Sequence, residues 1–313
     1  MDEARIPLGK TDIRIPPMGT GAWQWGDRTI WGFGGRYGPR EVEETFRASL
    51  AAGIDFFDTA ELYGSGRSEK FLGALMPTTD RKIILATKFF PFPWRLSRGS
   101  LHAALRASLK RLGRESVELY QIHQAMPPNP PELWAEALAE VAQRGLIRAA
   151  GISNYSAEWT RRAHATLARH GLPLASNQVE YSLLNRHIER DGTLRACQEL
   201  GVTIIAYSPL RKGVLGGKYT PENPPTGPRG AMFGAGYLRR AEPLLVLLRE
   251  IGAAHGGKTP AQVSLNWLIC KGAVPIPGAK SAAQVADNAG ALGWRLTQAE
   301  LMRLDEVSAP LAE

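Results

Sequence analysis

The sequence has little cysteine and no long apolar run. Of its 313 residues only two are cysteines, Cys197 and Cys270, and both lie in helix-like segments. We therefore expect no disulfide framework and a reducing, cytoplasmic environment. No apolar stretch reaches the roughly 18 residues that a membrane helix requires, and the N-terminus lacks the basic and apolar pattern of a secretory signal. These absences argue against a disulfide-stapled secreted protein and against a membrane protein or membrane partner.

Acidic residues are fewer than basic ones, 30 against 38, which gives a net charge of +8. Such an excess is compatible with nucleic acid binding, but the basic residues are scattered and no basic stripe with interleaved aromatic residues occurs. We interpret the charge as a generally basic surface and expect no nucleic acid partner. An anionic cofactor would use only a few of these charges.

Short β-branched runs alternate with amphipathic helical patterns, such as 40–52 and 101–112, along most of the chain. Glycines follow the expected ends of several helices, as C-terminal glycines do. Strands that alternate with helices pair in parallel through right-handed crossovers. The eight predicted strands are 17–21, 54–58, 82–88, 117–123, 147–151, 174–178, 203–206 and 273–276.

A chain of this length can form one barrel-sized domain or two smaller domains. An open doubly wound sheet would require a Gly-x-Gly-x-x-Gly turn after an early strand, and the sequence has none. No linker composition separates a second domain. We therefore predict an α/β fold, a (β/α)8 TIM barrel that forms a single domain over 1–313. A β-hairpin at about 5–15 precedes the barrel, and a long loop rich in glycine and proline, 212–236, follows strand seven.

Four polar side chains follow the ends of predicted strands two, three and four: Asp58, Tyr63, Lys88 and His123. Each alone has an ordinary explanation, such as a turn cap for Asp58 or a snorkelling stem for Lys88. In a barrel, however, these strand ends form the mouth where chemistry occurs. A tyrosine donates its proton more readily beside a cation, an aspartate can hold that cation, and a histidine can orient a carbonyl oxygen. Together they predict proton donation during carbonyl reduction.

The segments that carry these four residues resemble the aldo-keto reductases. They are Gly-Ile-Asp-Phe-Phe-Asp-Thr-Ala-Glu-Leu-Tyr-Gly, Ala-Thr-Lys and Gln-Ile-His, and the resemblance runs from about residue 5 to 308. It implies the barrel fold and NADPH-dependent reduction of an aldehyde or ketone to the alcohol. It also implies that Tyr63 is the general acid, assisted by Lys88, Asp58 and His123. We expect no metal ion.

The resemblance also implies a cofactor site along the later strands. Polar residues after strands can equally be ordinary turn residues. Lys280 matches the position that holds the adenosine 2′-phosphate and so favours NADPH, although lysine lacks the planar fork of the arginine in many relatives. In the family's pattern, the cofactor-binding residues are Ser153, Asn154, Gln178, Tyr207, Ser208, Leu210, Lys212, Gly213, Leu215, Gly278, Lys280, Ser281, Gln284 and Asn288.

Aromatic residues after strands one and three predict the substrate walls: Trp23, Trp25, Trp31, Phe89 and Trp94. Some of them must serve only loop packing, but aromatic walls suit a small flat carbonyl compound. The stretches Gly-Ala-Trp-Gln-Trp-Gly-Asp and Phe-Pro-Trp-Arg-Leu are similar to plant and cyanobacterial-type members, including pyridoxal reductases. Pyridoxal or another aromatic aldehyde is the predicted substrate.

Two other functions remain open at this point. One is a cofactor-sensing regulatory subunit of the potassium-channel β type, which would turn over very slowly and bind a membrane partner. The other is a phosphate-binding barrel isomerase, whose chemistry would not use Tyr63.

Overall fold

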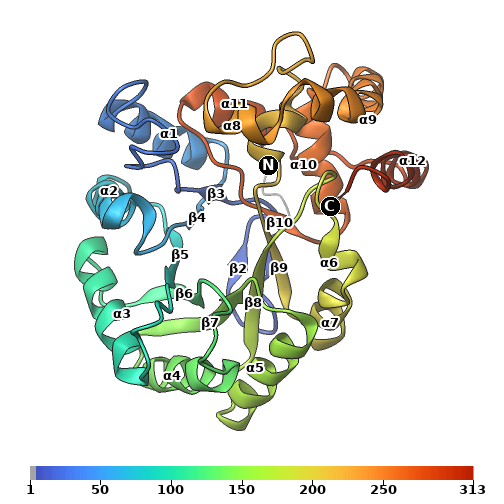
Figure 1. The fold of residues 1–313 in the computed structure, drawn as a ribbon. Coiled ribbons are helices and arrows are strands. Elements are labelled where there is room, and N and C mark those ends of the chain that lie inside the picture. The colour runs from blue at the N-terminus through green and yellow to red at the C-terminus, as the bar shows by residue number, and fades with distance from the viewer. Residues whose placement is uncertain (1–4, 313) are drawn as a thin grey trace.

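Eight parallel strands form a curled sheet, and helices surround it on the outside (Figure 1). The computed structural model describes residues 5–312, apart from the side chains of residues 228 and 229. Each strand is hydrogen-bonded to the next in chain order. The strands are β3 (Thr20–Gly21), β4 (Phe56–Asp58), β5 (Ile84–Phe89), β6 (Val117–Ile122), β7 (Ile147–Ser153), β8 (Leu174–Glu180), β9 (Thr203–Tyr207) and β10 (Val274–Pro275). All eight predicted strands are confirmed.

The two edge strands of this sheet meet and close the barrel. Gly21 and Gly278 form a parallel bridge. The amide of Gly19 donates to the carbonyl of Pro275 at 3.0 Å, and that of Gly21 donates to Pro277 at 3.2 Å. The predicted (β/α)8 architecture is therefore confirmed.

The helices bury the faces that their sequence patterns predict. In α1, Val42, Phe46 and Leu50 are buried, and Gly113 ends α3 in the left-handed conformation with φ of 62°. The α-helices are α1 (Pro39–Ala51), α2 (Arg67–Leu75), α3 (Arg98–Leu112), α4 (Pro131–Gln143), α5 (Ala157–Arg169), α6 (His187–Arg190), α7 (Thr193–Leu200), α8 (Pro228–Met232), α9 (Ala235–Ala254), α10 (Pro260–Cys270), α11 (Ala282–Ala289) and α12 (Gln298–Ser308). Short 3-10 helices are η1 (Tyr63–Gly66), η2 (Met76–Thr78) and η3 (Arg211–Gly216).

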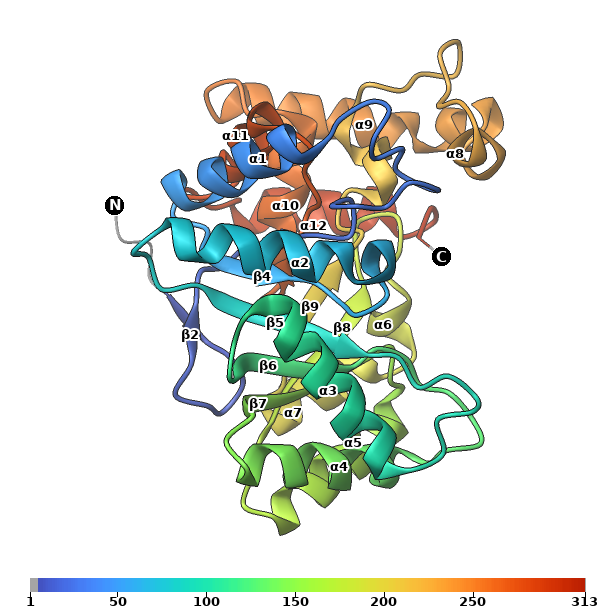
Figure 2. The same cartoon turned by 90° about the vertical axis from the view of Figure 1, so that its left-hand side faces the viewer.

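The predicted N-terminal hairpin covers one end of the barrel (Figure 2). Its strands β1 (Ile6–Pro7) and β2 (Arg14–Ile15) pair antiparallel. Leu8, Ile13 and Ile15 are buried in one cluster with inward-facing strand residues such as Phe56 and Ile205. The hairpin thus seals the barrel interior at that end, which leaves the opposite end, where the strands finish, for a binding site.

The segment 212–236 after β9 is less irregular than the sequence predicts. It contains most of η3, all of α8 and the start of α9. Lys212 and Gly213 both have positive φ, 53° and 99°, so the chain turns sharply directly after Arg211. Within residues 5–312, no helix is both long enough and apolar enough to cross a membrane.

Candidate active site

The barrel mouth contains a fully buried ammonium group with three oxygen partners. Lys88 Nζ donates to Asp58 Oδ1 at 2.5 Å, to the carbonyl of Thr59 at 2.8 Å and to Tyr63 Oη at 3.2 Å. The exposed fraction of the Lys88 side chain is 0% and that of Asp58 is 2%. A buried charge requires such partners because it has lost its water. The three residues are therefore one connected unit.

The second carboxylate oxygen of Asp58 is also bound. Gln178 Nε2 donates to Asp58 Oδ2 at 2.8 Å, and Gln121 Nε2 donates to the same atom at 3.2 Å. Sequence reasoning missed Gln121. Its signal is an amide near the end of the otherwise mostly apolar and fully buried strand β6. With both oxygens held, the carboxylate keeps a fixed orientation toward Lys88.

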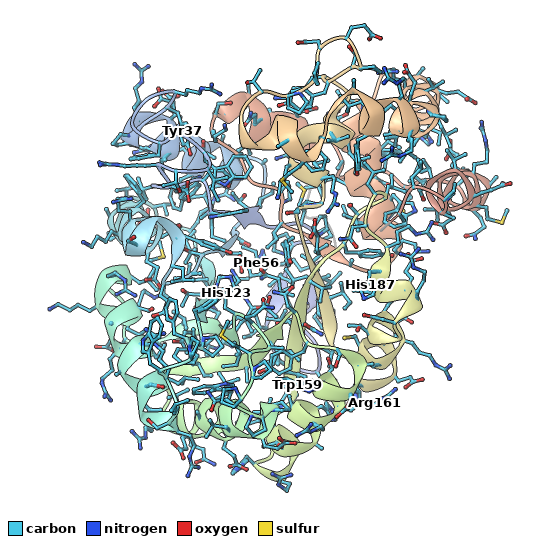
Figure 3. The ribbon with its side chains drawn as sticks, viewed as in Figure 1. Tyr37, Phe56, His123, Trp159, Arg161 and His187 are labelled. Carbon is cyan, nitrogen blue, oxygen red and sulfur yellow. The ribbon has the colours of Figure 1, made fainter. Side chains whose placement is uncertain are left out.

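His123 follows β6 directly and lies near the centre of the barrel, far from the peripheral Arg161 and His187 (Figure 3). Its ring centroid is 5.7 Å from that of Tyr63, and the two planes are nearly perpendicular. His123 Nδ1 is buried and has no hydrogen-bond partner among the described residues. Burial, together with the charge of Lys88, lowers the pKa of His123 to about 3, so the imidazole is neutral at physiological pH.

Burial dominates the pKa of Tyr63. It raises the pKa of the phenol above its usual value, and the positive charge of Lys88 offsets this only in part. The charge of Lys88 and its hydrogen bond lower this pKa, as expected for a nearby cation, but burial outweighs them and the Asp58 carboxylate adds to the rise. Burial alone would lower the pKa of Lys88, but the Asp58 carboxylate and Tyr63 outweigh it and leave that pKa raised. Both groups thus keep their protons at neutral pH.

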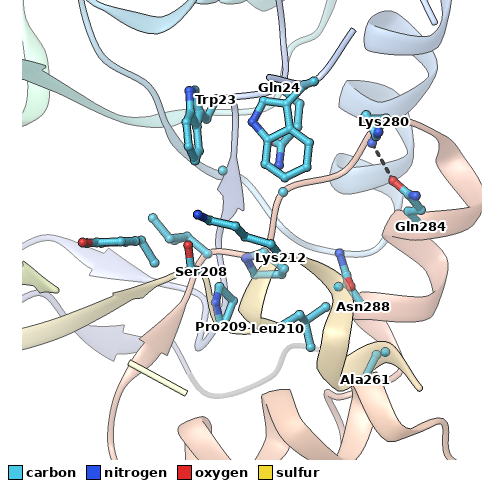
Figure 4. A pocket seen from close by; sticks show the side chains of 18 of the residues that line it. Trp23, Gln24, Ser208, Pro209, Leu210, Lys212, Ala261, Lys280, Gln284 and Asn288 are labelled. Carbon is cyan, nitrogen blue, oxygen red and sulfur yellow. Dashed lines mark hydrogen bonds between the residues drawn. The ribbon is translucent and has the colours of Figure 1, made fainter. Parts of the chain in front are cut away.

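A cavity of about 950 Å³ extends from Asp58, Tyr63 and His123 along β8 and β9 to α11. Figure 4 shows the part of it between Trp23, Lys212 and α11, where the amide of Lys280 donates to Gln284 Oε1 at 2.8 Å. All predicted cofactor residues line this cavity except two. Leu215 is instead fully buried in the hydrophobic core, and the Ser281 hydroxyl caps α11 by accepting from the amide of Gln284.

The end of the cavity near Tyr63 carries oriented amide groups. Asn154 Nδ2 donates to Gln124 Oε1 at 3.0 Å and to the carbonyl of His123 at 3.2 Å. Tyr207 Oη donates to Asn154 Oδ1 at 3.0 Å. Asn154 has a positive φ of 60°, a conformation that asparagine tolerates better than most residues. These contacts hold the amide in one orientation toward the cavity.

Only some of the predicted substrate-wall residues line the cavity. Trp23 and Trp31 line the cavity and contact each other edge to face at 5.5 Å between ring centroids. Trp25 and Phe89 are fully buried, so their prediction as walls is wrong. Side chains alternate along a strand, so Phe89 packs outward on Trp134 and the next residue, Phe90, lines the cavity instead.

Trp94 does not line the cavity either. Its exposed fraction is 73%, and its ring stacks on Phe92 at 4.6 Å. Several polar residues of the cavity wall were also missed by sequence reasoning, among them Gln24 and Arg36. Both lie in or beside the aromatic loop after β3, where nothing in the sequence indicates which side chains turn inward.

Comparison with known proteins agrees with this geometry. The aldo/keto reductase family model matches residues 17–309. The chain belongs to the aldo/keto reductase family. It is 41% identical over 307 residues to the chloroplastic pyridoxal reductase of Arabidopsis thaliana, an alignment that covers 94% of this chain and 83% of the relative.

Solved structures of other aldo-keto reductases share the fold. A glycerol dehydrogenase from Gluconobacter oxydans has a TM-score of 0.85 and 26% identity, covering 99% of this chain and 96% of that one. An aldo-keto reductase from Klebsiella pneumoniae in complex with NADPH has a TM-score of 0.78 and 27% identity, covering 100% and 97%. Aldo-keto reductases are oxidoreductases that use NAD(P)H, and the relationship supports carbonyl reduction.

The cavity of this aldo-keto reductase fits an extended dinucleotide. Amide side chains lie beside Tyr63, and the cationic Lys212 and Lys280 lie farther along the wall. Gln24 is buried beside Gly278, and its Oε1 has no hydrogen-bond partner among the described residues, so it can accept from a ligand hydroxyl or N–H. In the part of the chain that the structure describes, no group of three or more metal-binding side chains occurs.

Proposed function

We propose that this aldo-keto reductase uses NADPH to reduce an aldehyde or ketone to the alcohol. The observation that supports this most strongly is the contact of Lys88 Nζ with both Asp58 Oδ1 and Tyr63 Oη at one end of the cavity. Lys280 supports NADPH, because it lines the cavity and directly precedes Ser281, the N-cap of α11, and a helix N-terminus with a basic residue binds phosphate readily. The Klebsiella pneumoniae relative in complex with NADPH supports the same cofactor.

Tyr63 is the general acid in this proposal. When bound, the reduced nicotinamide supplies the hydride to the carbonyl carbon. The phenol of Tyr63 then transfers its proton to the carbonyl oxygen, and Lys88 stabilises the negative charge left on Oη. Asp58 keeps the ammonium in place through the 2.5 Å contact. Because the Lys88 side chain is fully buried, its charge acts on Tyr63 Oη at close range and with little screening by solvent.

His123 orients the substrate oxygen. It is neutral at physiological pH, so it carries no charge that would compete with Lys88 for the developing negative charge. Its ring and that of Tyr63 both line the cavity and stand nearly perpendicular to each other. A carbonyl oxygen placed there can accept from the phenol and from an imidazole N–H at once.

A flat aromatic aldehyde such as pyridoxal is the proposed substrate. Trp23, Trp31 and Phe90 give the cavity aromatic walls, which suit a planar ring. The Arabidopsis thaliana relative, 41% identical, is named a pyridoxal reductase. A panel of aldehydes offered with NADPH to the purified enzyme tests this choice.

Tyr63→Phe tests the acid. Because the variant lacks the transferable proton, we expect the turnover of an aromatic aldehyde to fall by about 100-fold or more. NADPH binding, measured by quenching of tryptophan fluorescence, should remain close to that of the wild type. Tyr155→Phe is the matched control, since the Tyr155 hydroxyl is buried in the core and outside the cavity. Near-normal turnover by the Tyr63 variant would refute the assignment.

A further inference from the structure

The backbone of Phe90 is held by an ion pair between Glu61 and Arg95. Glu61 Oε1 accepts from the amide of Phe90 at 2.8 Å and from Arg95 Nη1 at 2.5 Å. Arg95 Nη1 also donates to the carbonyl of Phe90 at 2.9 Å. The two charged side chains therefore bind both polar groups of one peptide residue, which is more than an ordinary surface ion pair does.

The ion pair is itself fixed by its surroundings. The exposed fraction is 9% for the Glu61 side chain and 23% for Arg95. Arg95 Nη2 makes a further contact to Glu61 Oε2 at 3.2 Å. The guanidinium lies 4.9 Å from the Phe89 ring and 5.3 Å from the Phe92 ring. A planar, partly buried arginine with these contacts has little freedom to move.

The ion pair and the residue that it holds both lie close to the proposed catalytic residues. Glu61 precedes Tyr63 by two residues, and its amide donates to the carbonyl of Lys88. The ring of Phe90 lines the cavity, and its centroid lies 5.6 Å from that of His123. The pair thus joins the loop that carries the acid to the loop that carries the aromatic wall next to the proposed position of the substrate carbonyl.

We propose that the Glu61–Arg95 pair positions Phe90 as the wall that selects flat aromatic carbonyl substrates. The inference rests on the proposed reduction reaction. Phe90 contacts the substrate ring, and Glu61 and Arg95 act through Phe90 as positioning residues. Loss of the guanidinium frees the Phe90 carbonyl and leaves Glu61 without its partner, so the ring no longer stays against the substrate. Small aliphatic aldehydes have no ring to pack against this wall, so the loss affects them less.

The test compares pyridine-4-carbaldehyde with propanal, using NADPH and purified full-length enzyme. For Phe90→Ala, we expect kcat/KM for the aromatic aldehyde to fall about tenfold, mostly through KM, as for one lost ring contact. The value for propanal should change by less than about threefold. Arg95→Met should lower the ratio of the two kcat/KM values in the same direction. In the double variant Phe90→Ala/Arg95→Met, the ratio should fall no further than in Phe90→Ala alone.

Two controls separate positioning from general stability. Arg162→Met breaks a comparable two-bond pair with Glu132, at 2.7 and 2.9 Å between α4 and α5, and should leave the ratio unchanged. The variant Glu61→Gln/Arg95→Met removes the unpaired carboxylate, so it should fold and still show the lowered ratio. The proposal would be overturned if the ratio were unchanged in both Arg95→Met and Glu61→Gln/Arg95→Met. It would also be overturned if the ratio in Phe90→Ala/Arg95→Met fell by the product of the two single effects. If the wild type reduced neither aldehyde, the proposed function itself would fail instead.

Discussion

At the scale of single residues, His123 shows how burial decides which groups carry charge at the site. Lys88 keeps its proton because Asp58 and Tyr63 lie within hydrogen-bond distance. His123 Nδ1 has no partner among the described residues, and burial together with Lys88 favours the neutral imidazole. At this end of the cavity Lys88 is therefore protonated and His123 is neutral. This division leaves a single positive charge beside Tyr63.

His123 should make the protein less stable in acid. Its pKa is lowered to about 3 in the folded protein, whereas an unfolded histidine titrates near 6.5. Between these values the unfolded chain binds the extra proton, so stability is fully present above about pH 6.5 and is lost as pH falls toward 3. The loss amounts to at most about 1.4 kcal/mol per pH unit. Between pH 7 and pH 5, the free energy of unfolding in urea should fall less for His123→Gln than for the wild type. Equal falls in the two proteins would contradict this prediction.

At the scale of secondary-structure elements, closure of the barrel depends on a glycine. An added Cβ at Gly21 would lie 2.8 Å from the carbonyl oxygen of Ile276, and the Gly21 amide donates to Pro277 across the same gap. β3 and the chain after β10 approach this closely only because no side chain lies between them. The same junction carries Gly278 and Gln24 on the cavity wall. Fold and site therefore share this contact.

Gly21→Ala should therefore destabilise the protein. Because backbone atoms must shift to admit the methyl group, we expect the free energy of unfolding to fall by about 1–3 kcal/mol. Gly236→Ala in the first turn of α9 is the control, since no heavy atom lies within 4 Å of its added Cβ. That variant should be as stable as the wild type or slightly more stable. Equal midpoints of chemical unfolding for both variants would show that closure does not require Gly21.

Strand and helix positions were predictable because they depend on local sequence patterns. The strands, the hairpin and the strand ends that carry Asp58, Lys88 and His123 all follow from periodicity and from the parallel arrangement. The directions of Phe89 and Phe90 follow from strand alternation after Lys88. Loop side chains were not predictable in this way: Trp25 turned into the core and Gln24 to the cavity. Such choices depend on contacts between distant segments, for example Trp25 Nε1 with the carbonyl of Ala279, which no local pattern encodes.

At the scale of the whole molecule, the hydrophobic core is continuous around the barrel. One buried cluster includes residues from Ala22 to Leu304, and a second fills the interior between the hairpin and the strands. The proposed cofactor groove uses residues from β3, from the chain after β9 and from α11. A ligand in this groove would contact residues at both edge strands of the sheet, β3 and the chain directly after β10. Such an arrangement favours cooperative unfolding, as the single-domain prediction requires.

The single-domain prediction can be tested by calorimetry with and without NADPH. We expect one unfolding transition, because no part of the barrel keeps its core when a neighbouring strand is lost. NADPH should raise its midpoint as a whole, since a ligand at 100 times its Kd adds about 2.7 kcal/mol to the folded state. Replacing the buried Ile15 of the hairpin by alanine should lower the same transition without splitting it. Two separable transitions, or a shift of only one of them by NADPH, would mean that the chain contains two folding units.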